Sequence, residues 1–185
     1  MNKITLTSFI AATILASCHN NQSQDNSNTM TTQTQVSADT ANKADDRKFL
    51  SKVALINLEE IKLGQLAQEK GTTQDIKDLG KMMIDEHTQA QNDLVQLAQK
   101  KSITVPTSPD ANAQDDYNDL DKKSGVDFDK KYCSMMVSGH KDAISMFEKD
   151  SAKETDSDIR QMAIATLPTL RKHLSHATMC KDNSK

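Results

Sequence analysis

Four residues that bind metals or protons stand near the middle of four apolar helical stripes in this sequence: Glu60, His87, His140 and His173. Each stripe repeats at alternating spacings of three and four residues, which is the spacing of one buried face of an α-helix. If the helices pack together, the four polar groups point into one core. Burial without partners is costly for such groups, so we expect them to bind one another or a shared ion.

Three imidazoles and one carboxylate form a ligand set suited to Zn, Fe, Mn or Cu, because neutral imidazole favours borderline metals and the carboxylate adds negative charge. His176, Glu59 and Glu86 are candidates to support these ligands or to join them. The alternative for these three is a solvated helix face. A histidine on an apolar face is also commonly a hydrogen-bonded core residue. A buried network of Glu60 and the three histidines is therefore the alternative to a metal site.

Methionine is frequent in the same region of the chain, and its thioether is a soft ligand for copper(I). Methionine is also the usual filler of irregular cores, and we expect packing to be its main role here. The methionines concerned are Met82, Met83, Met135, Met136, Met146, Met162 and Met179.

The sequence argues against two broad classes of function. The formal net charge is −3 and aromatic residues make up 3% of the chain, whereas a nucleic-acid surface is basic and rich in aromatic side chains. We therefore exclude nucleic acid as a partner. No Ser-His-Asp order, glycine-rich phosphate loop or HExxH motif occurs, so an enzymatic activity has the least support.

The segments around these residues are rich in good helix formers, and none has the pattern of a strand. Gly71 separates two long helices by a short turn, and Pro106 and Pro109 break the following stretch into a long crossover. Pro168 is expected to kink the last helix. We predict an all-α, ferritin-like four-helix bundle made of two antiparallel hairpins, which are joined by the crossover and a short extra helix. The expected helices span residues 45–70, 72–101, 114–123, 127–151 and 156–180.

The distances of the four polar residues from their turns place them at similar heights in such a bundle. Glu60 and His87 differ by about 5 Å, and His140 and His173 by about 8 Å, at a rise of 1.5 Å per residue. The sequence therefore predicts that the four side chains meet.

The N-terminal part of the chain has the features of a bacterial lipoprotein. Residues 1–17 resemble a secretory signal peptide, and the run that ends in Cys18 resembles a lipobox. We expect a lipid anchor on Cys18, followed by a disordered polar tether to residue 44, and the alternative is an apolar segment with a chance cysteine. The resemblance to bacterial lipoproteins implies the outer membrane rather than the inner one, because His19, and not an aspartate, follows Cys18. The bundle then spans 45–181, with a flexible tail at 182–185.

Two further cysteines, Cys133 and Cys180, remain when Cys18 is set aside. In an oxidising compartment an even pair indicates a disulfide. Both residues fall at the same end of the predicted second hairpin, to within about 8 Å along its axis. The alternative is two separate buried thiols. A metal-thiolate role has less support, because no Cys-x-x-Cys motif is present.

The helical region resembles the DUF4142 family of bacterial envelope proteins over about Asp46 to Thr178. The segments that carry the resemblance are Glu60–Ala67, Met83–His87, Phe128–Tyr132, Met136–His140, Phe147–Glu148, Leu167–Leu170 and His173–Leu174. The resemblance implies a ferritin-like four-helix fold and an envelope location, with the domain in the periplasm or at the surface. It implies no reaction.

The sequence departs from the di-iron members of the wider ferritin-like group. They carry a Glu-x-x-His pair on two helices, whereas here Ile84 precedes His87 by three residues and Leu170 precedes His173 by three. We expect an envelope lipoprotein that binds a transition metal in its core. The alternative is a structural or interaction module in which the same residues form a hydrogen-bond network.

Overall fold

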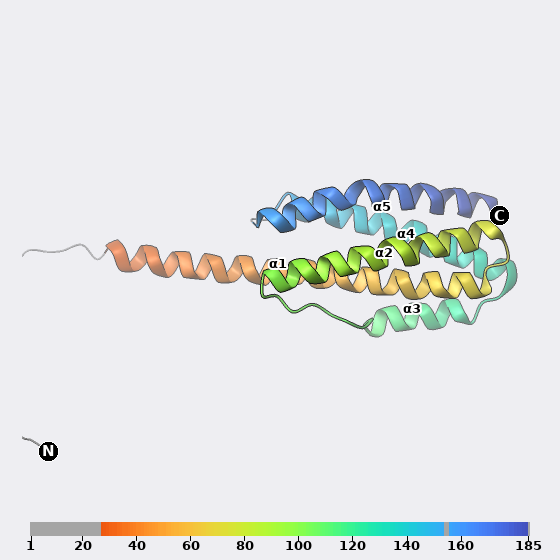
Figure 1. Cartoon of the computed structure of the whole chain (residues 1–185), viewed down its shortest axis with the longest axis horizontal. Coiled ribbons are helices and arrows are strands. Elements are labelled where there is room, and N and C mark those ends of the chain that lie inside the picture. The colour runs from red at the N-terminus through yellow and green to blue at the C-terminus, as the bar shows by residue number, and fades with distance from the viewer. Residues whose placement is uncertain (1–26, 154–155, 185) are drawn as a thin grey trace, which may run out of the picture. The chain divides into compact units, whose positions relative to one another are not determined.

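The computed structural model describes residues 27–153 and 156–184. Within these ranges the chain forms helices and no strand, which confirms the all-α prediction (Figure 1). Among the described residues, no helix has both the length and the apolar character needed to cross a bilayer. The helices are α1 (Ser27–Lys70), α2 (Gln74–Lys100), α3 (Ala111–Asp121), α4 (Gly125–Ser151) and α5 (Ser157–Asn183).

Helix α1 begins at Ser27, earlier than the start at Asp45 that the sequence predicts. Residues 27–44, which the sequence predicts as part of a disordered tether, therefore belong to this helix. By its contacts the chain divides into two units, Met1–Val36 and Ser37–Lys185. Extension of an existing helix needs no new nucleus, and this stretch contains alanine and glutamine, which favour helix. The signal peptide, Cys18 and the stretch up to residue 26 lie outside the described residues.

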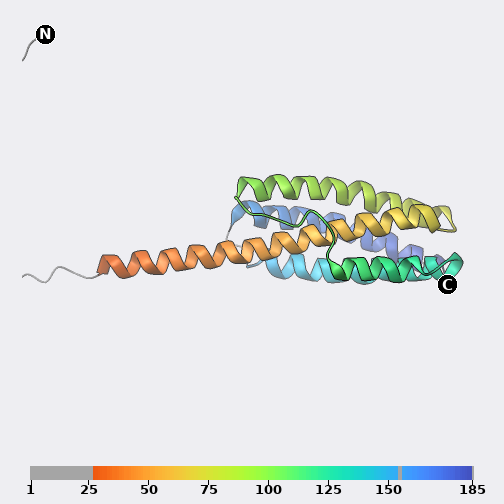
Figure 2. The same cartoon turned by 90° about the horizontal axis from the view of Figure 1, so that it is seen from below.

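A short turn joins α1 to α2 and makes them neighbours (Figure 2). The Gly71 N–H donates to the Ala67 carbonyl at 3.0 Å, and Thr73 caps α2 by accepting from the Ile76 N–H at 3.4 Å. Gly64 and Gly80 let the two backbones approach closely. A Cβ atom built on either glycine would lie 2.8 Å from the carbonyl oxygen of the other.

The crossover from α2 leads to the short helix α3, which Asp110 caps by accepting from the Ala113 N–H at 3.0 Å. Helix α3 begins at Ala111 and so is earlier than the predicted 114–123. Gly125 opens α4 with a φ of +59°, a conformation that residues with a Cβ rarely adopt.

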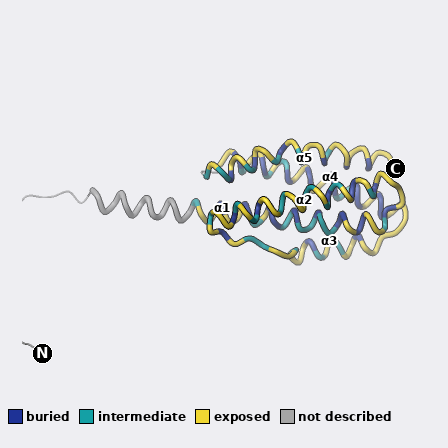
Figure 3. The backbone as a smooth tube through the Cα atoms, in the orientation of Figure 1, coloured by how far each residue is buried: buried dark blue, intermediate teal, exposed yellow. Residues whose placement is uncertain are grey.

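Helix α5 packs along α4 and also against α2. Asp156 caps it by accepting from the backbone N–H groups of Asp158 and Ile159 at 2.9 and 3.2 Å. The helix continues through Pro168 to Asn183. The long helices bury their inner faces and leave the outer faces exposed (Figure 3).

The core is divided into two apolar clusters. The first cluster includes Leu66, Met83, Tyr132 and Ala177, and the second includes Leu50, Leu94, Phe147 and Ile159. Along each long helix, one or two buried polar residues separate the part that belongs to one cluster from the part that belongs to the other. These residues are Asn57 and Glu60 on α1, His87 on α2, His140 on α4 and His173 on α5.

Candidate metal centre

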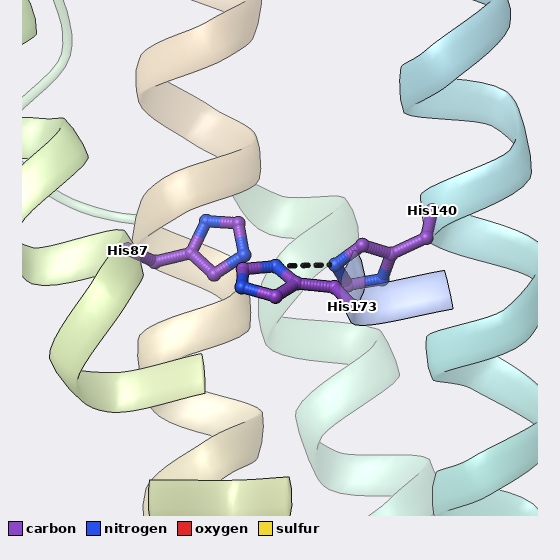
Figure 4. A group of neighbouring side chains, drawn as sticks. All are labelled: His87, His140 and His173. Atoms are coloured by element: carbon purple, nitrogen blue, oxygen red, sulfur yellow. Dashed lines mark hydrogen bonds between the residues drawn. The ribbon is translucent and has the colours of Figure 1, made fainter. Parts of the chain in front are cut away.

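Three histidines from three different helices meet in the layer between the two apolar clusters. His87, His140 and His173 retain 3%, 1% and 1% of their exposed surface. Each offers one ring nitrogen to a common space, and these three nitrogens all lie within 4.8 Å of one another (Figure 4). The ring centroids are 5.1 to 5.8 Å apart. The structure therefore brings together three of the four residues that the sequence predicts.

The tautomer of His140 is fixed by its own helix. Its Nδ1 lies 2.9 Å from the carbonyl oxygen of Met136, one turn earlier in α4. Because a carbonyl only accepts, Nδ1 carries the proton. The other ring nitrogen, Nε2, then carries no proton, and its lone pair faces the common space.

His87 is oriented by the amide of Asn57 on α1. The Asn57 Nδ2 donates to Gln91 Oε1 at 3.2 Å, which leaves its Oδ1 to accept from His87 Nδ1 at 3.0 Å. The lone pair of His87 is therefore on Nε2. This atom is buried and has no hydrogen-bond partner in the described part of the chain.

His173 is oriented by the Glu86 carboxylate on α2, which accepts from its Nε2 at 3.0 Å. The same carboxylate forms an ion pair with Lys172. Burial raises the pKa of Glu86, but hydrogen bonds from Lys172 and His173 outweigh that effect and hold it below its usual value. Glu86 is therefore a carboxylate at neutral pH, and the lone pair of neutral His173 is on Nδ1.

Three lone pairs consequently converge without a proton between them. His140 Nε2 and His173 Nδ1 are only 3.2 Å apart, and both are unprotonated when the rings are neutral. Two lone pairs at that distance repel each other unless a proton or a metal ion lies nearby. Each ring donates its other N–H to an oxygen acceptor, as metal-binding histidines generally do.

Burial keeps the rings neutral. Burial and, to a lesser degree, the neighbouring His173 lower the pKa of His140 to about 4, although the hydrogen bond to the Met136 carbonyl opposes the shift. Burial and the two other histidines lower the pKa of His87 well below its usual value. Burial also lowers the pKa of His173, although Glu86 opposes this. Neutral imidazoles are the form that binds metal.

A cavity of about 20 Å³ adjoins the layer and is lined by His87, His173 and Glu86 among others. One water-sized sphere needs about 10–15 Å³. The nitrogens need to approach one another slightly, because ligand nitrogens around a tetrahedral zinc ion at about 2.0–2.1 Å are closer together than 4.8 Å.

Glu60 lies beside the three histidines but outside the common space. Its Oε1 is 3.7 Å from His140 Nδ1, the nitrogen that faces away from the other rings. Glu60 is 6% exposed, and its Oε2 has no hydrogen-bond partner among the described residues. Burial, and to a lesser degree the charge of Glu59, raises the pKa of Glu60 to about 8. The group is a neutral acid at pH 7.

Glu59 and His176 are placed away from the three nitrogens. Glu59 borders a pocket of about 420 Å³ together with Asp116, and burial and that neighbour raise its pKa to about 7. His176 is exposed on α5, close enough to His173 to lower the pKa of that ring. Asn57 and the Met136 carbonyl also orient the rings, and the apolar stripes of the sequence do not indicate either of them. Asn57 lies three residues before Glu60, which is the one sequence signal that it shares the same helix face.

The two cysteines of the helical region are adjacent. Cys133 on α4 and Cys180 on α5 are both buried, and their Sγ atoms are 2.7 Å apart. They stand as free thiols. The disulfide stays a prediction, and the geometry places both sulfur atoms next to each other.

Solved structures with a similar fold include the DUF305 fragment from Deinococcus radiodurans, at 10% identity and a TM-score of 0.66, covering 75% of this chain and 96% of that one. CopM in its Cu(II)-bound form matches at 13% identity and a TM-score of 0.64, covering 76% and 97%. CopM in its Cu(I)-bound form matches at 15% identity and a TM-score of 0.61, covering 75% and 96%. At these identities the likeness shows the helical fold.

A comparison with curated proteins found no match. The family pattern described as a domain of unknown function, DUF4142, matches residues 31–179, which is most of the chain and includes all three histidines. The chain therefore belongs to the DUF4142 family.

Proposed function

We propose that the protein binds a transition metal ion through His87, His140 and His173. One observation carries this proposal: the outer hydrogen bonds of the three rings fix their tautomers so that three lone pairs meet in one buried space. A metal ion satisfies all three at once. Glu60 is a neutral neighbour of His140 rather than a ligand, so it does not balance the charge of the bound ion. The nearby negative charge is the Glu86 carboxylate, which is hydrogen-bonded to His173.

We favour copper among the ions that imidazole binds. Three neutral nitrogen ligands suit copper, zinc and iron, and manganese prefers more oxygen ligands than this layer offers. Two of the structures with a similar fold are copper-bound forms of CopM, which supports copper over zinc and iron. The function that follows is sequestration or delivery of the ion.

We also propose a ferritin-like arrangement for the four long helices and an envelope location for the protein. The short turn between α1 and α2, the crossover containing α3, and the packing of α4 along α5 support two hairpins of common design. The lipobox at Cys18 supports an anchor in the envelope, with the outer membrane preferred.

A hydrogen-bond network is the second candidate role for the layer. The observation that favours it is the contact of His140 Nε2 with His173 Nδ1 at 3.2 Å. If His173 were an imidazolium paired with Glu86, its Nδ1–H would donate to His140 and satisfy both rings. That state leaves His87 Nε2 without a partner and requires a charge on a ring whose pKa burial has lowered. The protein would then be a structural or interaction module.

Metal analysis of the purified protein separates the two roles. After incubation with Cu(II) or Zn(II) and removal of free ion, we expect about one tightly bound ion per chain in the wild type and in a Glu148→Gln control. We expect none in a His87→Asn, His140→Asn variant. The control removes an exposed carboxylate from α4 and leaves the three lone pairs in place.

Thermal unfolding provides the second readout, because an ion that binds only the native state raises the melting temperature. A metal-independent melting temperature, together with unchanged metal content in the double variant, would contradict the metal site and leave the network. Circular dichroism of the metal-free variants checks that the helices are intact.

A further inference from the structure

A second group of soft donor atoms lies on the surface, in a groove between α2 and α5. The groove has a volume of about 390 Å³. We propose that it binds a copper(I) ion through the Met82 and Met179 thioethers and the His176 imidazole. The lining residues that the argument uses are Met82, His176, Met179, Cys180, Asp75 and Asp78.

Packing does not account for one of the two methionines. Met179 is 61% exposed and is one of the few large apolar side chains of the described chain that face solvent. The filling of an irregular core, which explains a buried methionine, gives no reason for a thioether at this position. Met82 is partly buried and packs at the edge of the first apolar cluster, so its side chain is held at the side of the groove.

The helical register places the groove next to the three-histidine layer. On α5, His176 follows His173 by three residues and Met179 follows His176 by three. On α2, Met82 precedes Glu86 by four. Each step is about one helical turn, or about 5.4 Å. Met82 and His176 therefore lie about one turn beyond the contact between Glu86 and His173, and Met179 lies about two turns beyond it, on the same two helices.

The chemistry of the groove selects for a soft cation. Thioethers bind copper(I) well and hard divalent ions poorly, and imidazole accepts both. Asp75 and Asp78 also border the groove and give it negative charge that attracts a cation. Cys180 lies at the same groove, but its Sγ is engaged with Cys133 at 2.7 Å, so the proposal does not require it as a ligand.

Binding in the groove does not depend on the proposed function, because it has its own ligands. The two sites also differ in the ligand atoms that they offer. The groove is lined by two thioether side chains and one imidazole, and the layer offers three buried nitrogens.

The test is an anaerobic titration of the full chain with copper(I) in competition with the chelator bathocuproine disulfonate. Methionine labelled with ¹³C at the methyl group reports each thioether by NMR. In the wild type we expect two bound ions and shifted methyl signals from Met82 and Met179. A Met82→Leu, Met179→Leu variant is expected to bind one ion. The matched control is Met162→Leu, which changes a partly buried methionine of the other cluster and should still bind two.

Unchanged stoichiometry and affinity in the Met82→Leu, Met179→Leu variant would overturn the groove site. Unshifted Met82 and Met179 signals at saturating copper(I) would also overturn it. A His140→Asn variant separates the two proposals. It is expected to lose the buried ion and keep the methyl shifts in the groove. If the wild type binds only one ion and shows the methyl shifts, the groove stands and the buried site fails.

Discussion

His140 is the residue whose surroundings most directly set the behaviour of the site. Its Nδ1–H is held by the Met136 carbonyl, and its Nε2 lies 3.2 Å from His173 Nδ1. The ring cannot turn to present the other nitrogen without breaking the bond to its own helix. Asn57 and Glu86 have the same effect on the other two rings. The three proposed ligands are thus held in the tautomers that a metal ion requires, which would reduce the cost of binding.

Metal binding should resist acid more than exposed histidine sites do. Protons compete with the metal for each ring only below its pKa, and burial lowers that of His140 to about 4 from a usual value of 6.5. We expect the affinity for Cu(II) or Zn(II) to change little between pH 7 and pH 5 and to fall below that. Competition titrations with a chelator of known pH dependence measure this. A steady loss of affinity that begins near pH 6.5 would contradict the burial effect.

Substitution of Glu60 by glutamine should remove a pH-dependent cost to folding. Burial raises the pKa of Glu60 from 4.5 to about 8, so the folded chain holds a proton that the unfolded chain releases between those pH values. The contribution of Glu60 to the stability of the wild type therefore falls as the pH rises from about 4.5 to about 8, by on the order of 1 kcal/mol per pH unit. The Glu60→Gln variant has no proton to lose at this position.

We compare the free energies of unfolding of metal-free protein in urea at pH 5 and at pH 9. The difference between Glu60→Gln and the wild type is expected to shift in favour of the variant as the pH rises from 5 to 9. Glu148→Gln is the matched control, because Glu148 is exposed and paired with Arg171. Its effect on stability should be about the same at both pH values. Parallel stability curves for Glu60→Gln and the wild type would show that Glu60 ionises as it does in water.

The contact between α1 and α2 depends on two glycines, Gly64 and Gly80. A Cβ atom on Gly80 would lie 2.8 Å from the Gly64 carbonyl oxygen and 2.9 Å from the Ala67 Cβ. We therefore expect Gly80→Ala to destabilise the fold by about 1–3 kcal/mol, although alanine favours helix. Gly139→Ala is the control on α4, because its new Cβ meets only Glu60 Oε1 at 3.4 Å.

The Gly139→Ala control should be neutral or stabilising by up to about 1 kcal/mol, since it gains helix propensity without a severe clash. Thermal and urea unfolding of the two variants measure the difference. Equal free energies of unfolding for Gly80→Ala and the wild type would contradict this, because α1 and α2 would then make room for the added Cβ with no loss of stability.

The ends of α4 and α5 should become covalently joined under oxidising conditions. Cys133 and Cys180 lie 47 residues apart in sequence. A cross-link over such a loop lowers the entropy of the unfolded chain, which raises the free energy of unfolding by about 4 kcal/mol in the chain-entropy treatment. A thiol oxidant would accept two protons and two electrons from the pair, so that both S–H bonds are lost and one S–S bond forms. We expect a mass lower by two hydrogen atoms, no alkylation after unfolding, and a higher melting temperature than the reduced protein. Two alkylated thiols after exposure to oxidant would contradict the disulfide.

Much of this element arrangement could be predicted from the sequence, because it depends on local signals. Gly71 ends α1, Thr73 and Asp156 cap helices, and the spacing of the apolar residues identifies the buried faces. The position of Glu60 could not be predicted in this way. The stripe shows that Glu60 is buried, but not that its side chain lies on the Nδ1 side of His140, because that depends on side-chain conformation across two helices. The tautomers likewise depend on Asn57 and on a backbone carbonyl.

At the scale of the whole chain, the lipobox predicts how the protein is attached. Cys18 lies outside the described residues, so the prediction rests on the sequence. We expect the wild type to enter the detergent phase in Triton X-114 partition and to be labelled by radioactive palmitate, because acyl chains on one residue anchor a protein stably. A Cys18→Ser variant should stay in the aqueous phase. Detergent partition of that variant like the wild type would rule out the anchor.

The three proposed ligands come from α2, α4 and α5, and no two consecutive helices hold all of them. Under the proposed function, a nascent or unfolded chain therefore has no high-affinity site, and the ion would be acquired only when the bundle closes. If the chain crosses a membrane unfolded, as the signal-like N-terminus predicts, folding and metal acquisition would take place on the far side. The metals available there, and not those of the cytoplasm, would then decide the identity of the ion.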